Sequence, residues 1–355
     1  DGGFVAYGFC FVHVDNLSIS NIKKMGNAAK YAISVADINN FICDGIHIEN
    51  PSDGIHMQPP MRKVRITNIS GHTGDNVIAF TCGDYPQFLI TEDGDFEDVE
   101  ISGVYSDSNP TMSGIRFVGA GASGNGVYKN IVISNLKGKG SFVEPFGNDS
   151  VGAPWLSATK VINLVIKDTD FSMDDEDLFH TWYQAQVDNV VFDNIVWRGT
   201  VTAAKKLINL KAYNTVDTIT VKNCVIDADC TAAASQVVHD GSTLKTVNFE
   251  NCNIKGEALT LFYARADGGA TSPITVNIRN CKIDVDTLID TTFDVSLNIV
   301  NSEIKTANNF VDINSVADFR YQGNGNKWLS PTKCQIDGTG SETMVSISDT
   351  SFPLV

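Results

Sequence analysis

Basic residues are scarce in this chain. It has 26 Lys and Arg residues against 42 Asp and Glu residues in a total of 355, which gives a formal net charge of −16. Proteins that bind nucleic acid need clusters of Lys and Arg to neutralise the phosphates. The charge balance therefore argues against nucleic acid as a partner.

Long apolar runs are absent as well. A membrane-spanning helix needs roughly 20 consecutive apolar residues, and no stretch of the sequence reaches that length. We therefore expect no membrane insertion. The sequence also shows no signal peptide.

Signals for helices and for disulfide frameworks are rare. Heptads and capping boxes are scarce, which disfavours a helical fold. The eight cysteines lack the even spacing of small disulfide-rich domains. Three of them, Cys224, Cys252 and Cys281, directly follow an Asn of a repeated motif. We expect these three to form a stack of buried thiols, in a protein that folds in a reducing compartment.

The sequence does have a five-residue pattern that recurs twelve times. A large apolar residue, any residue, an apolar residue and any residue are followed by Asn, Asp or Gly. The starts lie 21 to 35 residues apart, a period typical of a solenoid. The pattern covers residues 17–21, 41–45, 64–68, 99–103, 131–135, 164–168, 190–194, 219–223, 247–251, 276–280, 297–301 and 319–323.

This pattern predicts an all-β fold, a right-handed single-stranded parallel β-helix of about twelve coils. Alternating apolar and polar residues mark a half-buried strand, which can bury its apolar face only by stacking on the equivalent strand of the next coil. Asn, Asp and Gly tolerate a left-handed backbone, so each strand should end in the same sharp bend. A β-sandwich would instead show hairpin turns such as Asn-Gly between paired runs.

The repeat also predicts the domain organisation. We expect a β-helix domain over residues 1–330 and a C-terminal cap or tail over residues 331–355. The chain begins abruptly at Asp1-Gly2-Gly3, close to its first coil, so we expect that upstream coils or a cap belong before it. The coils that start at residues 64, 99, 131 and 164 are longer than the first two, and their extra residues should leave the solenoid as loops that carry function.

Alignment of neighbouring coils gathers polar residues in one region. Matching Ile55, Ile78 and Ile115 places Asp53 beside Asn76, because stacked strands lie about 4.8 Å apart.

The same alignment places Asp75 one residue before Asn76, and it puts His56 and Arg116 in one column, two coils apart. Glycoside hydrolysis needs a proton donor and a second carboxylate. Two nearby carboxylates also raise one another's pKa, which helps to keep one of them protonated. We therefore expect Asp53 and Asp75 to be catalytic.

Further candidates come from the loops. We expect Asn76, His56 and Arg116 to bind the substrate, together with the loop residues Tyr85, Glu92 and Glu144. Tyr85 could stack on a sugar ring, and Glu92 and Glu144 are alternative proton donors. The acidic run at residues 174–177 lacks the spacing of a calcium loop and favours a charged, solvent-facing turn. We expect no metal and no cofactor.

The first part of the chain, about residues 1–150, resembles the polygalacturonase-type glycoside hydrolases of the pectin-lyase-like superfamily. Their Asn-Thr-Asp motif corresponds to Pro51-Ser52-Asp53, their Gly-Asp-Asp motif to Gly74-Asp75-Asn76, and their Arg-Ile-Lys motif to Arg116-Phe117-Val118. Asn76 and Val118 stand where the family has Asp and Lys, and the Gly-His-Gly motif of the family is absent.

The resemblance implies roles for these residues. Asp75 would be the general acid, Asp53 would help to activate water, and Arg116 would contact an acidic sugar. The inverting mechanism of the family would follow.

The overall style is similar to that of bacteriophage tailspikes, which are parallel β-helices, usually homotrimers, that cleave or bind bacterial capsule or O-antigen. This resemblance implies a homotrimer located in a virion tail or outside the cell. Our leading hypothesis is a polysaccharide depolymerase that hydrolyses a bacterial surface glycan. Two alternatives stay open: a polysaccharide lyase with Arg116 or His56 as its base, and a glycan-binding adhesin without catalytic activity.

Overall fold

The structure is a computed structural model, and it describes the chain in segments that form two compact units. Unit 1 comprises Asp1–Thr169 and Asp175–Asp188, and unit 2 comprises Asp170–Asp174 and Asn189–Val355. The described residues are 7–26, 30–82, 90–91, 94–106, 114–119, 126–138, 142–146, 159–172, 177–182, 184–201, 204–230, 235–265, 273–313, 318–329, 333–336 and 345–349.

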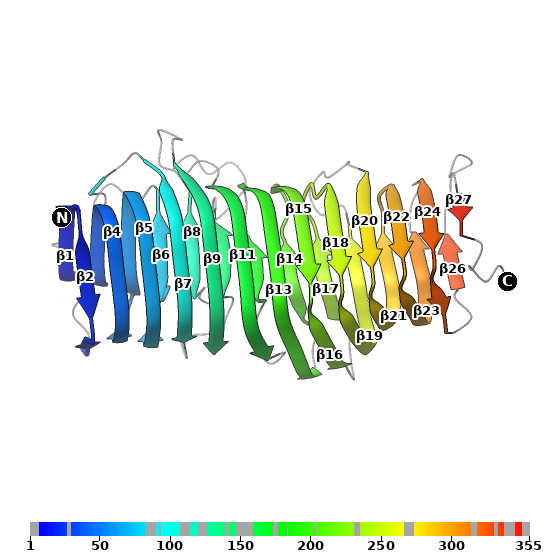
Figure 1. Ribbon diagram of the computed structural model, residues 1–355, viewed down its shortest axis with the longest axis horizontal. Helices are drawn as coiled ribbons and strands as arrows, with labels where there is room; N and C mark the ends of the chain where they lie inside the picture. The colour runs from blue at the N-terminus through cyan, green and yellow to red at the C-terminus, as the bar shows by residue number, and fades with distance from the viewer. Residues whose placement is uncertain are drawn as a thin grey trace. The chain divides into compact units, whose positions relative to one another are not determined.

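Every regular element of the described residues is a β-strand (Figure 1). The strands of unit 1 are β1 (Tyr7–Val14), β2 (Leu17–Ser20), β3 (Lys23–Lys24), β4 (Tyr31–Asn50), β5 (Asp53–Thr73), β6 (Ile78–Thr81), β7 (Phe96–Ser106), β8 (Ile115–Val118), β9 (Val127–Gly138), β10 (Val143–Phe146) and β12 (Phe179–Thr181). Two strands have residues in both units, β11 (Thr159–Ser172) and β13 (Ala185–Val201).

Unit 2 contains the remaining strands. They are β14 (Lys206–Leu210), β15 (Thr215–Lys222), β16 (Val225–Cys230), β17 (Ser235–Asp240), β18 (Thr246–Glu250), β19 (Asn253–Ala264), β20 (Ile274–Arg279), β21 (Lys282–Thr291), β22 (Val295–Val300), β23 (Glu303–Ile313), β24 (Phe319–Asn324), β25 (Lys327–Trp328), β26 (Lys333–Ile336) and β27 (Val345–Ser348).

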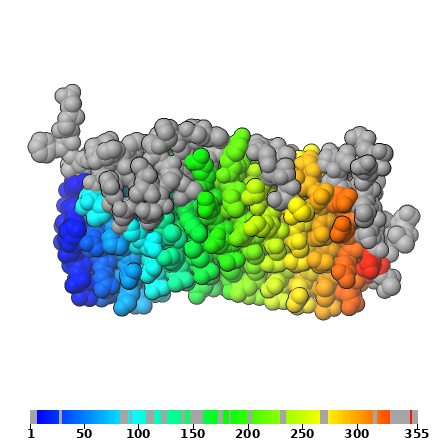
Figure 2. Space-filling model, turned by 90° about the horizontal axis from the view of Figure 1, so that it is seen from above, coloured from blue at the N-terminus to red at the C-terminus, as the bar shows by residue number. Residues whose placement is uncertain are grey.

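Within each unit, strands pair in parallel with their equivalents one coil away. In unit 1, Phe41 pairs with Val64, which pairs with Val99. In unit 2, Val247 pairs with Val276, which pairs with Leu297. Colours therefore advance in sequence order within each unit of Figure 2. This pairing confirms the predicted parallel β-helix, whereas the hand of the solenoid and its number of coils stay predictions.

The predicted left-handed bend at the end of each pattern is confirmed for eleven of the twelve repeats. Asn21, Gly45 and Asn68, for example, have φ angles of 57°, 66° and 56°. The last repeat was predicted two residues too early. Leu297 pairs with Tyr321, not with Phe319, so the left-handed residue of that coil is Gly325 (φ 67°) and not Gly323.

The apolar residues of the patterns form the core of each unit. Phe41, Ile66 and Ile133 are fully buried in unit 1, as are Val247 and Leu297 in unit 2. The predicted thiol stack is confirmed, because Cys224, Cys252 and Cys281 are buried and unoxidised. The backbone N–H of Cys252 donates to Sγ of Cys281 at 3.4 Å.

Two further expectations concern the ends and the membrane. Within residues 331–355, β26 pairs in parallel with β23 and β27 pairs with β24, so strands of the expected cap continue the ladder, and the boundary at residue 330 stays a prediction. Among the described segments, no helix is long and apolar enough to cross a membrane.

Candidate functional site

The coil alignment predicted from the sequence is confirmed by the strand register of unit 1. Ile55 pairs with Ile78, which pairs with Ile115. The same pairs of strands align His56 with Ala79, and Ala79 with Arg116. His56 and Arg116 therefore lie in one column, two coils apart, as predicted.

Asp53 and Asp75, hereafter the acid pair, are joined by Asn76, the residue that directly follows Asp75. The side-chain nitrogen of Asn76 donates to Oδ1 of Asp53 at 3.0 Å and to Oδ1 of Asp75 at 2.9 Å. The backbone N–H of Asn76 lies within hydrogen-bond distance of the same two oxygens, at 3.1 and 3.0 Å. Because the side-chain nitrogen of Asn76 contacts both Oδ1 atoms, the separation of these two oxygens cannot exceed the sum of the two N···O distances.

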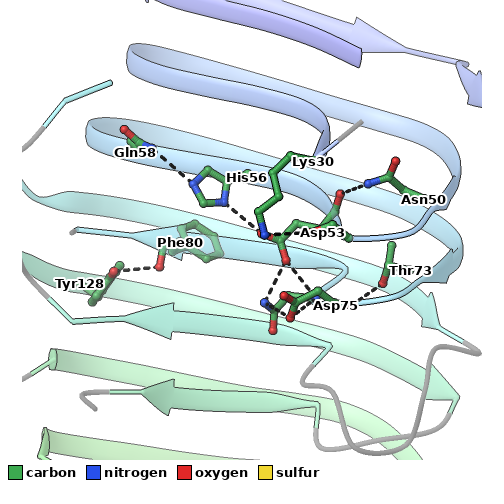
Figure 3. Close-up of polar contacts among 11 residues, drawn as sticks. Lys30, Asn50, Asp53, His56, Gln58, Thr73, Asp75, Phe80 and Tyr128 are labelled. Carbon is green, nitrogen blue, oxygen red and sulfur yellow. Dashed lines mark hydrogen bonds and ion pairs between the residues drawn. The ribbon is translucent and has the colours of Figure 1, made fainter. Parts of the chain in front are cut away.

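Asp53 is held by several partners, which Figure 3 shows around its carboxylate. The residue is 5% exposed, and its Oδ2 accepts a hydrogen bond from Nδ1 of His56 at 3.2 Å. Burial alone would raise the pKa of this carboxyl. The hydrogen bonds from His56 and Asn76, together with the nearby positive charge of Lys30, outweigh burial and hold the pKa below its usual value.

The surroundings of His56 fix its tautomer. Oε1 of Gln58 accepts hydrogen bonds from the backbone N–H groups of Ile90 and Thr91, at 2.6 and 3.0 Å, so the amide nitrogen of Gln58 faces His56. That nitrogen lies 3.4 Å from Nε2 of His56, which must therefore be the accepting nitrogen. His56 donates to Asp53 through Nδ1 and has no lone pair left for a substrate, so it positions Asp53.

Asp75 has the opposite electrostatic environment. It is half-buried, and burial raises the pKa of its carboxyl. The negative charge of Asp53 raises this pKa further, against the positive charges of Arg116 and Lys30. The acid pair thus combines one carboxyl whose pKa is lowered with one whose pKa is raised.

The side chain of Asn76 also has a hydrogen-bond acceptor, Oδ1, that no donor of the described residues contacts. Its Oδ1 is buried and has no hydrogen-bond partner in the described part of the chain. An unpaired buried acceptor costs stability, and a sugar hydroxyl or a water molecule would satisfy it. This atom lies in the residue that bridges the acid pair, so the site could accept a hydrogen-bond donor from a ligand there.

Arg116 and Glu144 extend the site along the column. Glu144 on β10 pairs in register with Arg116 on β8, and Oε1 of Glu144 lies 2.7 Å from Nε of Arg116. The Arg116 N–H does not point at this oxygen, so the contact is an ion pair without a hydrogen bond. The guanidinium also lies over the ring of Phe146, 4.8 Å from its centroid.

Several features of the site were missed by reasoning from the sequence. Lys30 and Gln58 lie close to the acid pair, on the same coil or on the adjacent coil, yet neither belongs to a sequence motif. Two predicted substrate-binding residues, Tyr85 and Glu92, lie outside the described residues. Within the described segments, no cluster of three or more His, Cys, Asp or Glu side chains could hold a metal ion.

Comparisons of this chain with protein-family models, with curated proteins and with solved structures find no match.

Proposed function

We propose that this protein is a polysaccharide depolymerase, a glycoside hydrolase that cleaves a bacterial surface polysaccharide such as capsule or O-antigen. One observation carries the proposal: two carboxyl groups share Asn76 while their surroundings shift their pKa values in opposite directions. Pairs of this kind are typical of sites in which one carboxyl donates a proton and the other stays ionised.

In this proposal Asp75 is the general acid. Its raised pKa keeps a proton available for the glycosidic oxygen of the leaving sugar. The unpaired Oδ1 of Asn76 would accept a hydrogen bond from a sugar hydroxyl and so hold the chain against Asp75. Arg116, whose charge reaches Asp75, would bind an anionic group of the substrate.

Asp53 has an electrostatic role in the same proposal. Its two carboxylate oxygens are occupied by Asn76 and His56, and the residue is almost fully buried, which leaves little room for an attacking water. Inverting enzymes separate their carboxyl groups by about 6.5–9.5 Å to admit that water. The negative charge of Asp53 instead favours the protonated form of Asp75.

The proposal is tested by incubating the purified protein with a panel of capsular and O-antigen polysaccharides and analysing the products by mass spectrometry. Oligosaccharides that gain one water per cut support it, and Asp75→Asn should then reduce cleavage at least about 100-fold. Glu100→Gln is the matched control, since Glu100 is an exposed carboxylate of the same unit paired with Arg65. Binding without cleavage across the panel would replace the proposal with a non-catalytic glycan-binding protein.

A homotrimer located in a virion tail or outside the cell is part of the same proposal, because it would present the solenoid to a cell surface. Light scattering on the full chain should then give three times the protomer mass of 38.4 kDa. A measured mass equal to that of one protomer would overturn the proposed trimer and would not affect the proposed chemistry.

A further inference from the structure

Three buried thiols of unit 2 lie in one column, hereafter the thiol column. Cys224, Cys252 and Cys281 occupy equivalent positions, each directly before one of the register-paired strands β16, β19 and β21. They are 1%, 3% and 3% exposed, and none of the three is oxidised. The function proposed above does not use them.

The three sulfurs make the same contacts. Each lies within 3.3 Å of the carbonyl oxygen two residues earlier, and within 3.7 Å of a carbonyl oxygen of the preceding coil. These partners are Lys222 and Phe192 for Cys224, Glu250 and Val221 for Cys252, and Arg279 and Phe249 for Cys281. Because the contacts repeat, the sulfurs repeat with the spacing of the coils, about 4.8 Å.

This spacing is too wide for a disulfide and suits a metal ion between two sulfurs. A disulfide bond is about 2.05 Å long. A zinc–thiolate bond is about 2.3 Å long and Cu(I)–thiolate bonds are similar, so an ion in a straight line between two sulfurs needs them about 4.6 Å apart. Thiolates select soft cations such as Cu(I), which accept two ligands in a line.

One ion cannot reach three sulfurs in a row. This agrees with the finding that no cluster of three or more His, Cys, Asp or Glu side chains in the described segments could hold a metal ion. A two-coordinate ion needs only two neighbouring thiols, and the thiol column contains two such pairs. Cys252 belongs to both pairs, whereas Cys224 and Cys281 belong to one each.

The thiols lie just beneath the surface, and their neighbours affect their ionisation. Cys252, for example, lies between the exposed residues Asn251 and Asn253. The contact with the Cys252 side chain lowers the pKa of Cys224, and the contact with the Cys224 side chain raises the pKa of Cys252 to about 12. Metals bind the thiolate, so Cys224 supplies the first thiolate of this pair.

We propose that the thiol column binds one soft, two-coordinate cation of the Cu(I) class, in a line between Cys252 and either Cys224 or Cys281. Two S–H bonds break and two S–Cu bonds form, the two protons pass to solvent, and neither sulfur is oxidised. This site departs from the expectation, drawn from the sequence, that the protein takes no metal. It does not depend on the function proposed above.

The column itself shows that serine fits at these positions. Ser302 follows Cys281 in the column, and its Oγ accepts a hydrogen bond from the backbone N–H of Cys281 at 3.1 Å. Sγ of Cys281 accepts from the N–H of Cys252 in the same way. Oγ of Ser302 also donates to the carbonyl oxygen of Val300, two residues earlier, at 3.0 Å. Replacing a thiol of the column with serine therefore preserves these contacts.

The test titrates the intact chain with Cu(I) in the absence of oxygen, with bicinchoninate as a competing chelator. All proteins carry Cys10→Ser, which removes an exposed thiol of unit 1. We expect one Cu(I) per chain, with two sulfur neighbours by X-ray absorption. Cys252→Ser should weaken binding about 100-fold or more, because the remaining sulfurs lie about 9.6 Å apart. Cys224→Ser and Cys281→Ser each keep one pair and should leave the affinity nearly unchanged.

Two further variants separate the metal site from folding defects. Cys252→Ala should lose affinity as Cys252→Ser does. Cys43→Ala is the matched control, because Cys43 is a buried thiol of unit 1 that pairs in register with Ile19 and Ile66 and should not affect binding. Urea denaturation checks that each variant is folded.

Four results would overturn the proposal. They are failure of the Cys10→Ser protein to bind Cu(I), unchanged affinity of Cys252→Ser, loss of binding in Cys224→Ser and Cys281→Ser alike, and a disulfide within the column after mild oxidation. The third would show that one ion needs all three sulfurs. The fourth, detected by mass spectrometry of peptides, would show that the sulfurs are not held at the spacing of the coils.

Discussion

The imidazole of His56 lies flat on the ring of Tyr31, with 3.7 Å between the ring centroids and 9° between the planes. Tyr31 pairs in register with Asp53, one coil away. The aromatic plane of one coil therefore sets the orientation of the imidazole that holds the carboxylate of the next coil.

Replacing Tyr31 with Leu should loosen this arrangement. We expect the free energy of unfolding to fall by about 2–4 kcal/mol, because a fully buried ring is lost, and hydrolysis to slow as Asp53 is held less firmly. Tyr31→Phe retains the stacked ring and should retain most of the activity. Urea denaturation and product analysis measure both effects, and equal activity of the Leu and Phe variants would contradict the positioning role.

The proton affinity of Asp75 should depend on Asp53. Because the negative charge of Asp53 raises the pKa of Asp75, Asp53→Asn should lower that pKa toward its usual value. Titration of the Asp75 carboxyl by ¹³C NMR measures the change directly. If Asp75 is the proposed general acid, hydrolysis by the wild type should fail as pH rises through the raised pKa, because Asp75 then loses its proton. An unchanged Asp75 pKa in the variant would show that burial alone sets it.

Replacing Asn76 with Asp should be costly at neutral pH. The new side chain cannot donate to the acid pair, and it adds a third carboxylate to a buried site. We expect a loss of about 3 kcal/mol in the free energy of unfolding at pH 7, and a smaller loss at pH 4, where carboxyl groups take up protons. Asn251→Asp, an exposed change in unit 2, is the control and should cost less.

A buried acid in unit 2 should make stability depend on pH. Oδ1 of Asp240 accepts hydrogen bonds from the N–H and the hydroxyl of Ser242, while Oδ2 has no partner in the described part of the chain. Burial raises the pKa of Asp240 to about 7. The folded state then binds this proton more tightly than the unfolded state does, so its contribution is fully present below the unfolded pKa and is lost as pH rises through 7.

We therefore expect Asp240→Asn to flatten the fall in stability between pH 4 and pH 8, by on the order of 3 kcal/mol. Urea denaturation of both proteins at the two pH values measures the difference. Identical pH dependence in the two proteins would show that Asp240 is ionised in the folded state.

The sequence predicted the strands well because one stacking rule governs every coil. Apolar alternation and the Asn at its end fix the register of repeats such as 247–251 and 276–280. The rule failed at Phe319, where two overlapping alternations share one stretch and only pairing with β22 selects Tyr321. It also missed a second left-handed position directly before five of the patterns in unit 1, at Asn40, Lys63, Asp98, Asn130 and Asn163.

The acid pair could be found because its residues lie beside aligned isoleucines. The Asp177–His180 contact could not be found, because Asp177 belongs to the acidic run 174–177, which predicts a charged, solvent-facing turn. That prediction is wrong for Asp177, which is buried and lies 3.0 Å from Nδ1 of His180. A usable signal was present, since the spacing Asp-x-x-His occurs both at Asp53 and at Asp177. Gln58 shows a further limit: its role depends on backbone N–H groups more than 30 residues away, which no motif encodes.

The Asn side chains at the bends of unit 2 form a chain of identical contacts. Asn251 donates to Asn223, and Asn280 donates to Asn251, each at 3.3 Å. Each bend therefore presents the same acceptor to whichever coil comes next. A gene that loses residues 224–251 would join Asn223 to Cys252 and rebuild the same junction, whereas loss of one residue within a strand would turn every following side chain to the opposite face. Over this stretch, we expect deletion or duplication of a whole coil to preserve the register of the coils that follow.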